Sequence, residues 1–267
     1  MKKIHKPILS RFDFYFFRSP GPGLGNLMFP LARSYLLAQR DESPLYIPTL
    51  FQLKLGTILR REKDLRLYWN IRQPRRIQDL KNYCLLLFYR LLKLKNRYHY
   101  EIGLGNLFLD FTDNDTESLR CFFKILARRR EVRIHEDIKK IGIHLRGSDF
   151  SKKPGRGFSI RLPKLYYEKA IQWAKAQNPD SKIKIIAFWD GCEDYKDLIK
   201  ICDSIDESGD ALNAIISLSC CDYIVCSRST FSLWSAFLST NSTMIVLDSD
   251  FDTEQYIDLR RRNVKRI

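Results

Sequence analysis

The chain has 267 residues, of which 45% are hydrophobic and 29% are charged, and its formal net charge is +15. This balance is that of a folded globular protein and excludes an intrinsically disordered chain, and the length predicts roughly two domains of about 100–200 residues. The excess of positive charge indicates an anionic partner, which could be nucleic acid, a phosphate-bearing small molecule or an acidic membrane surface. Thirteen Lys or Arg residues lie from Lys54 to Arg97 against three acidic residues, and a solvated face is the alternative to a binding role for them.

The seven cysteines are an odd number, and they form neither a CxxC pair nor a cluster with histidine at zinc spacing. Cys84 and Cys226 lie in apolar runs, where a buried, reduced thiol is the usual state. The cysteines therefore predict a reducing compartment and no structural metal. Residues 1–17 are basic without a long apolar core or a cleavage site, and no window approaches the ~20 apolar residues of a membrane span. We expect a cytoplasmic protein.

The first half of the chain shows few clear elements. An aromatic strand is predicted at 12–17, a turn-rich segment at 19–26, and a helix over 28–36 because its apolar residues repeat at helical spacing. A short strand is predicted at 45–47. From there to residue 136 the pattern indicates no definite element, and we assign 1–136 to an N-terminal domain.

The second half alternates strands and helices. Continuous apolar runs of this kind predict an α/β domain over 137–267, with a parallel sheet covered on both faces. In such Rossmann-like domains, ligands bind at the carboxyl ends of the strands. The predicted strands are 141–145, 183–189, 223–226 and 243–247; the predicted helices follow Pro163 and cover 195–202, 211–218 and 229–238.

Two segments at predicted strand ends could bind phosphate. The glycines of 21–26 expose backbone amides at a helix start, which attracts phosphate or a polar sugar; a plain tight turn is the alternative. The strand at 141–145 places His144, Arg146 and Asp149 at the mouth of the sheet. Arg146 could bind a phosphate through two hydrogen bonds and stabilise a departing diphosphate, or it could pair with an aspartate that only organises the loop.

Two further segments follow later strands. Asp190 comes directly after a strand, where a carboxylate could accept a hydrogen bond from a nucleobase or ribose, or could instead cap the following helix. Ser227, Ser229 and Thr230 cluster where a strand gives way to a helix, and their hydroxyls and amides could bind a diphosphate. Simple capping by Ser229 is the alternative.

These segments resemble the α1,2-fucosyltransferases, glycosyltransferase family 11. GLGNLMFPLARSYLL at 23–37 is similar to the family's N-terminal motif GLGNQMFQYA, and HLRGSDF at 144–150 resembles the HxRRGDY motif of several fucosyltransferase families. SRSTFSLWSAFL at 227–238 is similar to NSTFSWWGAWL, and FWDGCEDY at 188–195 is a looser match to an FSDD-like segment. The four segments occur in the family's order.

The resemblance implies a GT-B architecture, in which two Rossmann-like domains face each other across a cleft and the C-terminal one binds GDP-fucose. It implies an inverting transfer of fucose to a glycan hydroxyl that needs no metal or other cofactor. It assigns Arg146 to the β-phosphate and His144 and Asp149 to the catalytic region. The implied donor-site residues are Gly23, Gly25, Asn26, Asp190, Ser227, Ser229, Thr230 and Phe231.

The chain also departs from the family motifs. Gly147 stands where the family has a second arginine, Ser148 replaces the motif's glycine, and Leu27 replaces a glutamine. These changes leave open another GDP-sugar, or a sugar-binding module without catalysis. No residue is an obvious general base, and Asp13, His144 and Asp149 are the candidates.

Two other hypotheses concern the basic residues. A nucleic-acid-binding protein is the alternative from a different class, but no recognition motif accompanies the basic cluster, and we expect no nucleic-acid partner. The run 83–95 mixes apolar and basic residues. It predicts either a core helix with cations at its end or an interfacial segment that holds the enzyme peripherally at the anionic inner face of the cytoplasmic membrane, near a lipid-linked glycan acceptor.

Overall fold

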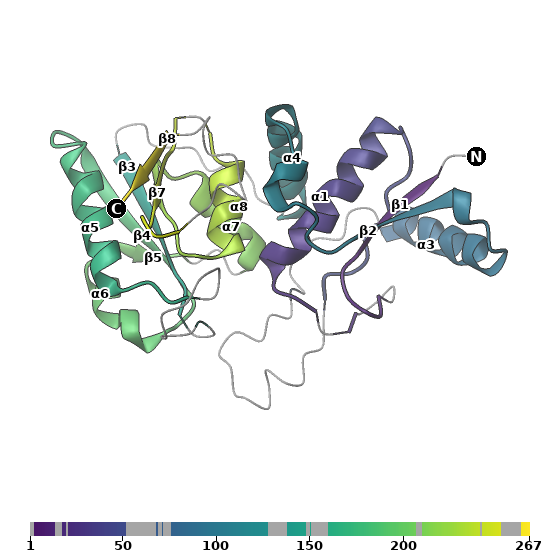
Figure 1. The fold of residues 1–267 in the computed structure, drawn as a ribbon, viewed down its shortest axis with the longest axis horizontal. Coiled ribbons are helices and arrows are strands. Elements are labelled where there is room, and N and C mark those ends of the chain that lie inside the picture. Colours follow the sequence, from purple (N-terminus) through teal and green to yellow (C-terminus); the bar gives the residue numbers. More distant parts are fainter. Residues whose placement is uncertain are drawn as a thin grey trace. The chain divides into compact units, whose positions relative to one another are not determined.

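A computed structural model describes residues 3–13, 18–19, 21–51, 68, 71, 76–127, 138–147, 150, 160–206, 210–240, 242–251 and 263–267. The chain divides into two compact units, Met1–Arg128 (unit 1) and Arg129–Ile267 (unit 2), whose elements are labelled in Figure 1. The domain boundary predicted after residue 136 lies outside the described residues. The two units are described one at a time.

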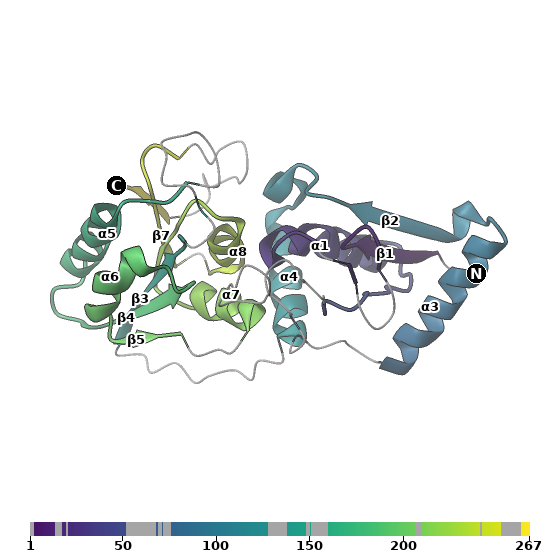
Figure 2. The ribbon, with the colours of Figure 1, turned by 90° about the horizontal axis from the view of Figure 1, so that it is seen from below.

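Unit 1 is built on two parallel strands, β1 (Ile4–Ile8) and β2 (Tyr98–Ile102), and its elements are drawn in Figure 2. Helix α1 (Leu24–Arg40) packs along both strands. Helix α4 (Asp113–Leu126) begins with a capping box between Thr112 and Asp115, and its Phe122 ring stacks on Tyr35 of α1 at 4.1 Å. The remaining described elements are α3 (Arg76–Leu91), η1 (Lys95–Arg97) and η2 (Leu107–Asp110).

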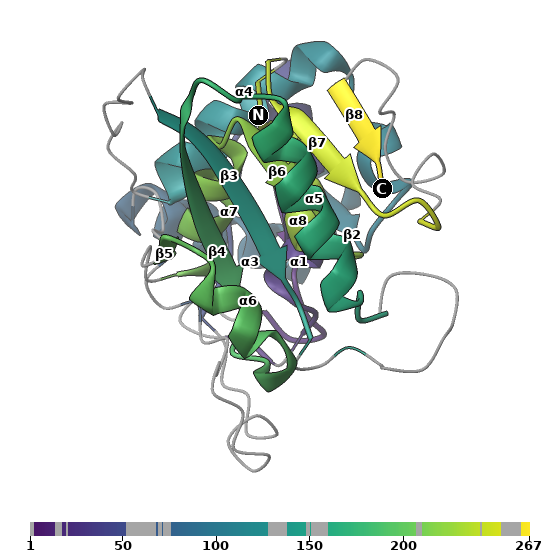
Figure 3. The same ribbon diagram turned by 90° about the vertical axis from the view of Figure 1, so that its left-hand side faces the viewer.

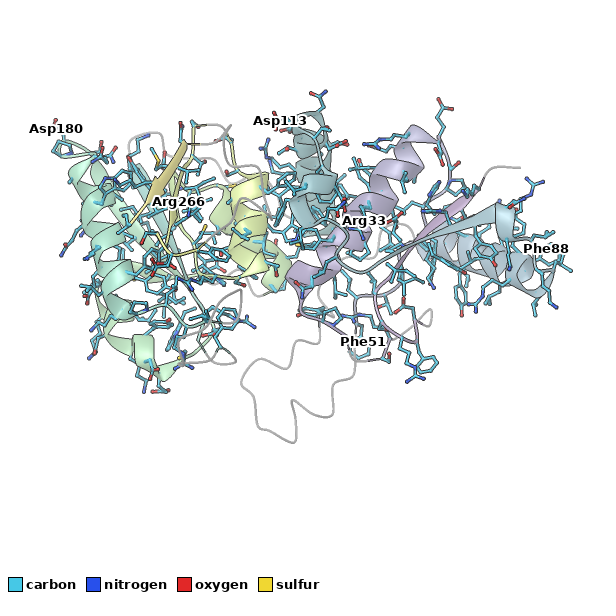
Figure 4. All side chains as sticks on the ribbon, viewed as in Figure 1. Arg33, Phe51, Phe88, Asp113, Asp180 and Arg266 are labelled. Atoms are coloured by element: carbon cyan, nitrogen blue, oxygen red, sulfur yellow. The ribbon has the colours of Figure 1, made fainter. Side chains whose placement is uncertain are left out.

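One arginine of α1 fixes the turn that follows β2. Arg33, labelled in Figure 4, places its Nε 2.7 Å from Glu101 and one Nη 3.2 Å from Asp110. It also donates to the carbonyls of Ile102, Gly103 and Leu104. Only 12% of the Arg33 side chain is exposed, so these bonds tie residues 101–110 to α1 with little competition from water.

Unit 2 has the α/β fold with a parallel sheet that the sequence predicts. The described strands pair in the order β5-β4-β3-β6-β7-β8, all parallel. Counted within this unit, the order is 3-2-1-4-5-6, which is that of dinucleotide-binding folds. The strands are β3 (Ile138–Leu145), β4 (Lys182–Trp189), β5 (Ser204–Ile205), β6 (Tyr223–Val225), β7 (Met244–Leu247) and β8 (Asn263–Arg266).

Helices cover both faces of this sheet. Figure 3 shows α5 (Lys164–Ala176) and α6 (Lys196–Lys200) on one face, with α7 (Ala211–Ser219) and α8 (Thr230–Leu238) on the other. The short η3 (Glu193–Tyr195) leads into α6. Tyr166, Tyr167 and Ala170 of α5 pack on Ile143 and Leu145 of β3, so the apolar helix face predicted after Pro163 is the core face.

Some of the strand predictions are wrong, and some strands were missed. The strand predicted at 12–17 is wrong at Phe12, which is 53% exposed outside any strand, and residues 14–17 lie outside the described part. At 45–47 the structure has one bridge, between His5 and Leu45, and no strand. Strands β1, β2, β5 and β8 were not predicted.

Candidate functional site

The site in unit 2 lies where the strand order reverses. β3 and β6 are neighbours in the sheet, and the helix after β3 packs on one face while the helix after β6 packs on the other. In open parallel sheets, ligands bind in the crevice outside the carboxyl ends of the strands at such a reversal. The HLRGSDF and SRSTF segments begin there.

Three predicted site residues meet at this reversal. His144 is the second-last residue of β3, and its Nδ1 lies 2.7 Å from the Ser227 Oγ. Its ring stacks on the Phe231 ring at 4.5 Å between centroids and 7° between planes. His144 and Ser227 are buried, whereas Phe231 is half-buried. The structure thus joins two motifs that lie more than eighty residues apart in the chain.

The start of α8 supplies the second part of the site. Ser229 caps the helix, and its Oγ accepts from the Phe231 amide at 3.2 Å, so the capping role holds for this residue. The Ser232 Oγ donates to the carbonyls of Ser227 and Ser229 at 2.9 and 3.1 Å, which fixes the loop before the helix. Thr230 is half-buried at the first helical position. The positive end of the helix therefore lies just past the carboxyl end of β6.

Arg146 lies on the other side, just past β3. Its side chain is 19% exposed, its Nε lies 3.7 Å from an Asp190 carboxylate oxygen, and its guanidinium lies over the Phe150 ring at 5.6 Å. Asp190 accepts from the amides of Gly147 at 2.9 Å and Cys192 at 3.2 Å. Asp190 therefore joins the loops after β3 and β4, and Cys192, not Asp190, is the N-cap of the next helix.

Arg161 fills the space at Gly147. A Cβ added at Gly147 would meet the Cys192 Sγ at 2.7 Å, and the Arg161 Nε and Tyr195 Cε2 at 3.0 Å each. Arg161 donates to the Gly147 carbonyl and pairs with Asp194. A guanidinium from outside the HLRGSDF segment thus lies beside the position where the family motif has its second arginine.

Further contacts hold in place the segments at the carboxyl ends of β6 and β7. The Tyr166 hydroxyl donates to the carbonyls of Cys226 at 2.8 Å and Val246 at 3.0 Å, and burial raises its pKa well above the usual range. Arg228, after β6, places its Nε 2.6 Å from Asp248, after β7. These contacts fix the loops that carry Ser227 and Ser229. The sequence analysis did not predict the roles of Arg161, Tyr166 and Asp248 at the site, because no local pattern marks residues that act across strands.

The remaining predicted residues lie elsewhere. Asp149 and Ser148 fall outside the described residues. Gly23, Gly25 and Asn26 belong to unit 1, where Gly23 is the N-cap of α1, so the geometry of the unit 2 site does not include them. Among the described residues, no atom lies within 4 Å of where a Gly23 Cβ would be, and the amide of Leu24 at this helix start donates to the Tyr68 hydroxyl at 3.1 Å. Asp13 accepts from the Leu9 amide and the Ser10 hydroxyl, which organises its own turn.

The described residues contain no group of three or more His, Cys, Asp or Glu side chains that could hold a metal ion. None of the seven cysteines, all of which are described, forms a disulfide. Burial raises the pKa of the Cys226 thiol to about 12, so this thiol next to the site stays protonated and is no nucleophile. In the described part of the chain, no helix combines the length and the hydropathy needed to cross a bilayer.

The family model for glycosyl transferase family 11 matches residues 24–266. The chain belongs to this family. The match confirms the resemblance of the four sequence segments, and it makes the chain a glycosyltransferase of the fucosyltransferase family named above. It also spans the basic stretch 54–97, and no comparison supports the nucleic-acid-binding alternative.

Solved structures of another fucosyltransferase are similar to this chain. They are NodZ alpha-1,6-fucosyltransferase co-crystallised with GDP (15% identity, TM-score 0.44), the same enzyme soaked with GDP-fucose (14%, 0.44), and NodZ from Bradyrhizobium (15%, 0.45). Each alignment covers 89% of this chain and 93% of the other. No curated protein sequence matches the chain.

Proposed function

We propose that the chain transfers fucose from GDP-fucose to a glycan hydroxyl with inversion, forming an α1,2 linkage. The observation that carries this proposal is the convergence of Arg146, the Ser227 loop and the start of α8 at the switch point of a dinucleotide-type sheet. Such a crevice suits a nucleoside diphosphate. Membership of glycosyl transferase family 11 supplies the reaction class.

We further propose a GT-B arrangement, with the GDP-sugar held by 137–267 and the acceptor side formed by 1–136. In this arrangement Gly23, Gly25 and Asn26 face the donor sugar. The room that the described residues leave at the Cβ position of Gly23 supports this role.

In the reaction, the acceptor hydroxyl oxygen forms a bond to the anomeric carbon as the bond from that carbon to the β-phosphate oxygen breaks. The electron pair of the broken bond leaves with GDP, and the hydroxyl proton passes to a base. Arg146 and the amide end of α8, with Ser229 and Thr230, stabilise the charge that grows on the diphosphate. We propose that these groups act without a metal. Arg161 adds a second guanidinium at Gly147, although Asp194 balances part of its charge.

For the base, His144 and Asp149 remain the candidates, because the Asp13 carboxylate is engaged in its own turn. Phe231 and His144 form a stacked pair that would border the donor. Asp190 would act mainly by holding the Gly147 amide and orienting Arg146, in addition to any contact with guanosine.

Nucleotide selectivity tests the donor class. GDP should raise the melting temperature of the full chain, and UDP, ADP and CMP should not, because a ligand at a hundred times its Kd adds about 2.7 kcal/mol to stability. A larger shift with UDP or CMP would exclude GDP-fucose as the donor. GDP-fucose and GDP-mannose, offered with a panel of glycans, then separate fucose from another GDP-linked sugar, while GDP binding without turnover would indicate a sugar-binding module.

Substitution of Arg146 tests the site. Arg146→Ala should lower turnover by about 10²–10³, because one donor to the developing charge is lost, and the fold should remain intact. Arg146→Lys should restore little, since a point charge lacks the paired donors of a guanidinium. Arg40→Ala is a matched control, because Arg40 is 60% exposed on α1. Turnover of Arg146→Ala within a few-fold of the control would remove Arg146 from the mechanism.

A further inference from the structure

Helix α3 turns apolar residues away from the core of unit 1. Its inner face is formed by Leu86 and Tyr89, which pack on Ile4 and Tyr46, and by the buried polar Asp79 and Asn82. The opposite face repeats at helical spacing, so its side chains form one continuous stripe. The exposed residues of this stripe are Ile77 (88%), Leu80 (46%), Cys84, Leu87 (38%), Phe88 (52%) and Leu91 (81%).

The stripe continues into the turn after α3, and the exposed charged residues described beside it are all cations. Leu92 is 53% exposed and Leu94 41% exposed. The exposed charged residues from α3 to η1 are Lys81, Arg90, Lys93 and Lys95, and the single acidic residue of 77–97, Asp79, is buried. We name this surface, from Ile77 to Lys95, the α3 face; Phe88 is labelled on it in Figure 4.

We propose that the α3 face docks the enzyme onto the surface of a bilayer rich in anionic lipid. Contiguous exposed apolar surfaces commonly mark sites of interaction with a protein or a membrane. Leucine, isoleucine and phenylalanine on one side of a helix with Lys and Arg at its margins fit the boundary between headgroups and acyl chains, because the long cations reach the headgroups while the apolar chains enter below them.

Two other partners for the α3 face, a second copy of the chain and a nucleic acid, fit it less well. A symmetric pair of copies would bring Lys81, Arg90, Lys93 and Lys95 against the same residues of the partner, and like charges in contact are repulsive. Nucleic acid would match the charge but not the aliphatic stripe, since bases stack on aromatic side chains. An anionic lipid surface matches both. The inference is independent of the donor and linkage proposed above.

Co-sedimentation of the full chain with vesicles tests the proposal. Binding should be strong to mixed phosphatidylglycerol and phosphatidylcholine vesicles at low salt, weak to pure phosphatidylcholine, and should fall as salt rises. K93Q/K95Q should weaken binding about thirtyfold, because each basic residue near an anionic surface contributes a factor of about five. L87Q/F88Q should weaken it at least as much, since it removes two of the inserted side chains.

Matched controls lie on α5 of unit 2. Lys169 and Lys175 are exposed there, as is Leu165 at 57%, so K169Q/K175Q and L165Q remove the same charge or a similar side chain elsewhere. The controls should bind as the wild type does. Three results would each overturn the proposal: equal recovery with neutral and anionic vesicles, no binding to either, or equal losses in the α3 and α5 variants. A concentration-dependent dimer that only L87Q/F88Q abolishes, without vesicle binding, would assign the α3 face to a second copy instead.

Discussion

Gly147 stands where the family motif has an arginine, and its replacement by alanine tests how tightly the surrounding side chains pack against it. The added methyl group would lie 2.7 Å from the Cys192 Sγ and 3.0 Å from Arg161 and Tyr195. Cys192 and Tyr195 are 7% and 1% exposed, so neither can move into solvent. Gly147 has no positive φ, and the effect of the substitution is therefore steric and not a matter of backbone strain.

The expected loss is about 1–3 kcal/mol of unfolding free energy, the usual result of inserting a methyl group into a packed region. Urea unfolding of the full chain, followed by tryptophan fluorescence, measures this loss. Three of the four tryptophans, Trp173, Trp189 and Trp234, belong to unit 2, so the signal reports mainly on the unit that contains Gly147. Gly147→Arg, which restores the family's arginine, should be at least as destabilising and should not raise turnover.

A double-mutant cycle identifies the cause. Cys192→Ala removes the sulfur atom nearest to the new methyl group and on its own should lower stability by about 1 kcal/mol, as for one buried methylene. In the double variant the methyl group enters the space of the lost sulfur, so the combined loss should be smaller than the sum by about 1 kcal/mol or more. Full stability of Gly147→Ala, or strict additivity in the double variant, would refute this account of Gly147.

Three further predictions rest on other contacts. Tyr166→Phe should lower the stability of unit 2 by about 1–3 kcal/mol, measured by the same fluorescence, because the buried Cys226 carbonyl loses its hydroxyl donor and the Val246 carbonyl keeps only the Cys226 amide; an unchanged urea midpoint would contradict the bracing role. Burial acts to raise the pKa of Glu101, but hydrogen bonds from Arg33 and His99 outweigh it and lower the pKa. The stability that Glu101 contributes should thus be complete above its ordinary value of 4.5 and be lost as pH falls through the lowered pKa, and Glu101→Gln should remove that part of the pH dependence. Iodoacetamide at pH 8 should label the exposed cysteines of the native protein, as mapped by mass spectrometry, and spare Cys226 until the chain is unfolded.

The second half of the chain could be predicted because its strands are buried on both faces. Short, mainly apolar runs such as 141–145 and 223–226 are typical of buried parallel strands when they alternate with helices that show an apolar face at helical spacing. β8 escaped prediction because Asn263–Arg266 is a polar edge strand, and β5 because it has two residues. In unit 1, β1 contains His5 and Lys6, which are 1% and 4% exposed. Lys6 lies over the rings of Tyr46 and Tyr100, a contact between distant segments that no local pattern reveals.

The α3 segment shows a different limit of sequence analysis. Its apolar residues predict a helix, but the run alone does not say which side faces the core. The structure buries Leu86 and Tyr89 together with the polar Asp79 and Asn82. It exposes Leu87, Phe88 and Leu91, so a second apolar stripe faces away from the core. The core-helix interpretation is therefore wrong for these exposed residues, and their exposure is the reason for proposing a partner.

Gly147 shows what a change in a family motif means physically. From the sequence, the missing arginine indicates a lost positive charge and a weakened or inactive site. The structure shows that a side chain at 147 has no room, because Cys192, Arg161 and Tyr195 surround that point, and Arg161 also donates to the Gly147 carbonyl. The glycine and Arg161 therefore depend on each other: a larger residue at 147 would press on the guanidinium, and loss of Arg161 would remove a donor to the Gly147 carbonyl. A motif departure of this kind is best judged by what occupies the space around its Cα, and here that space holds a cation.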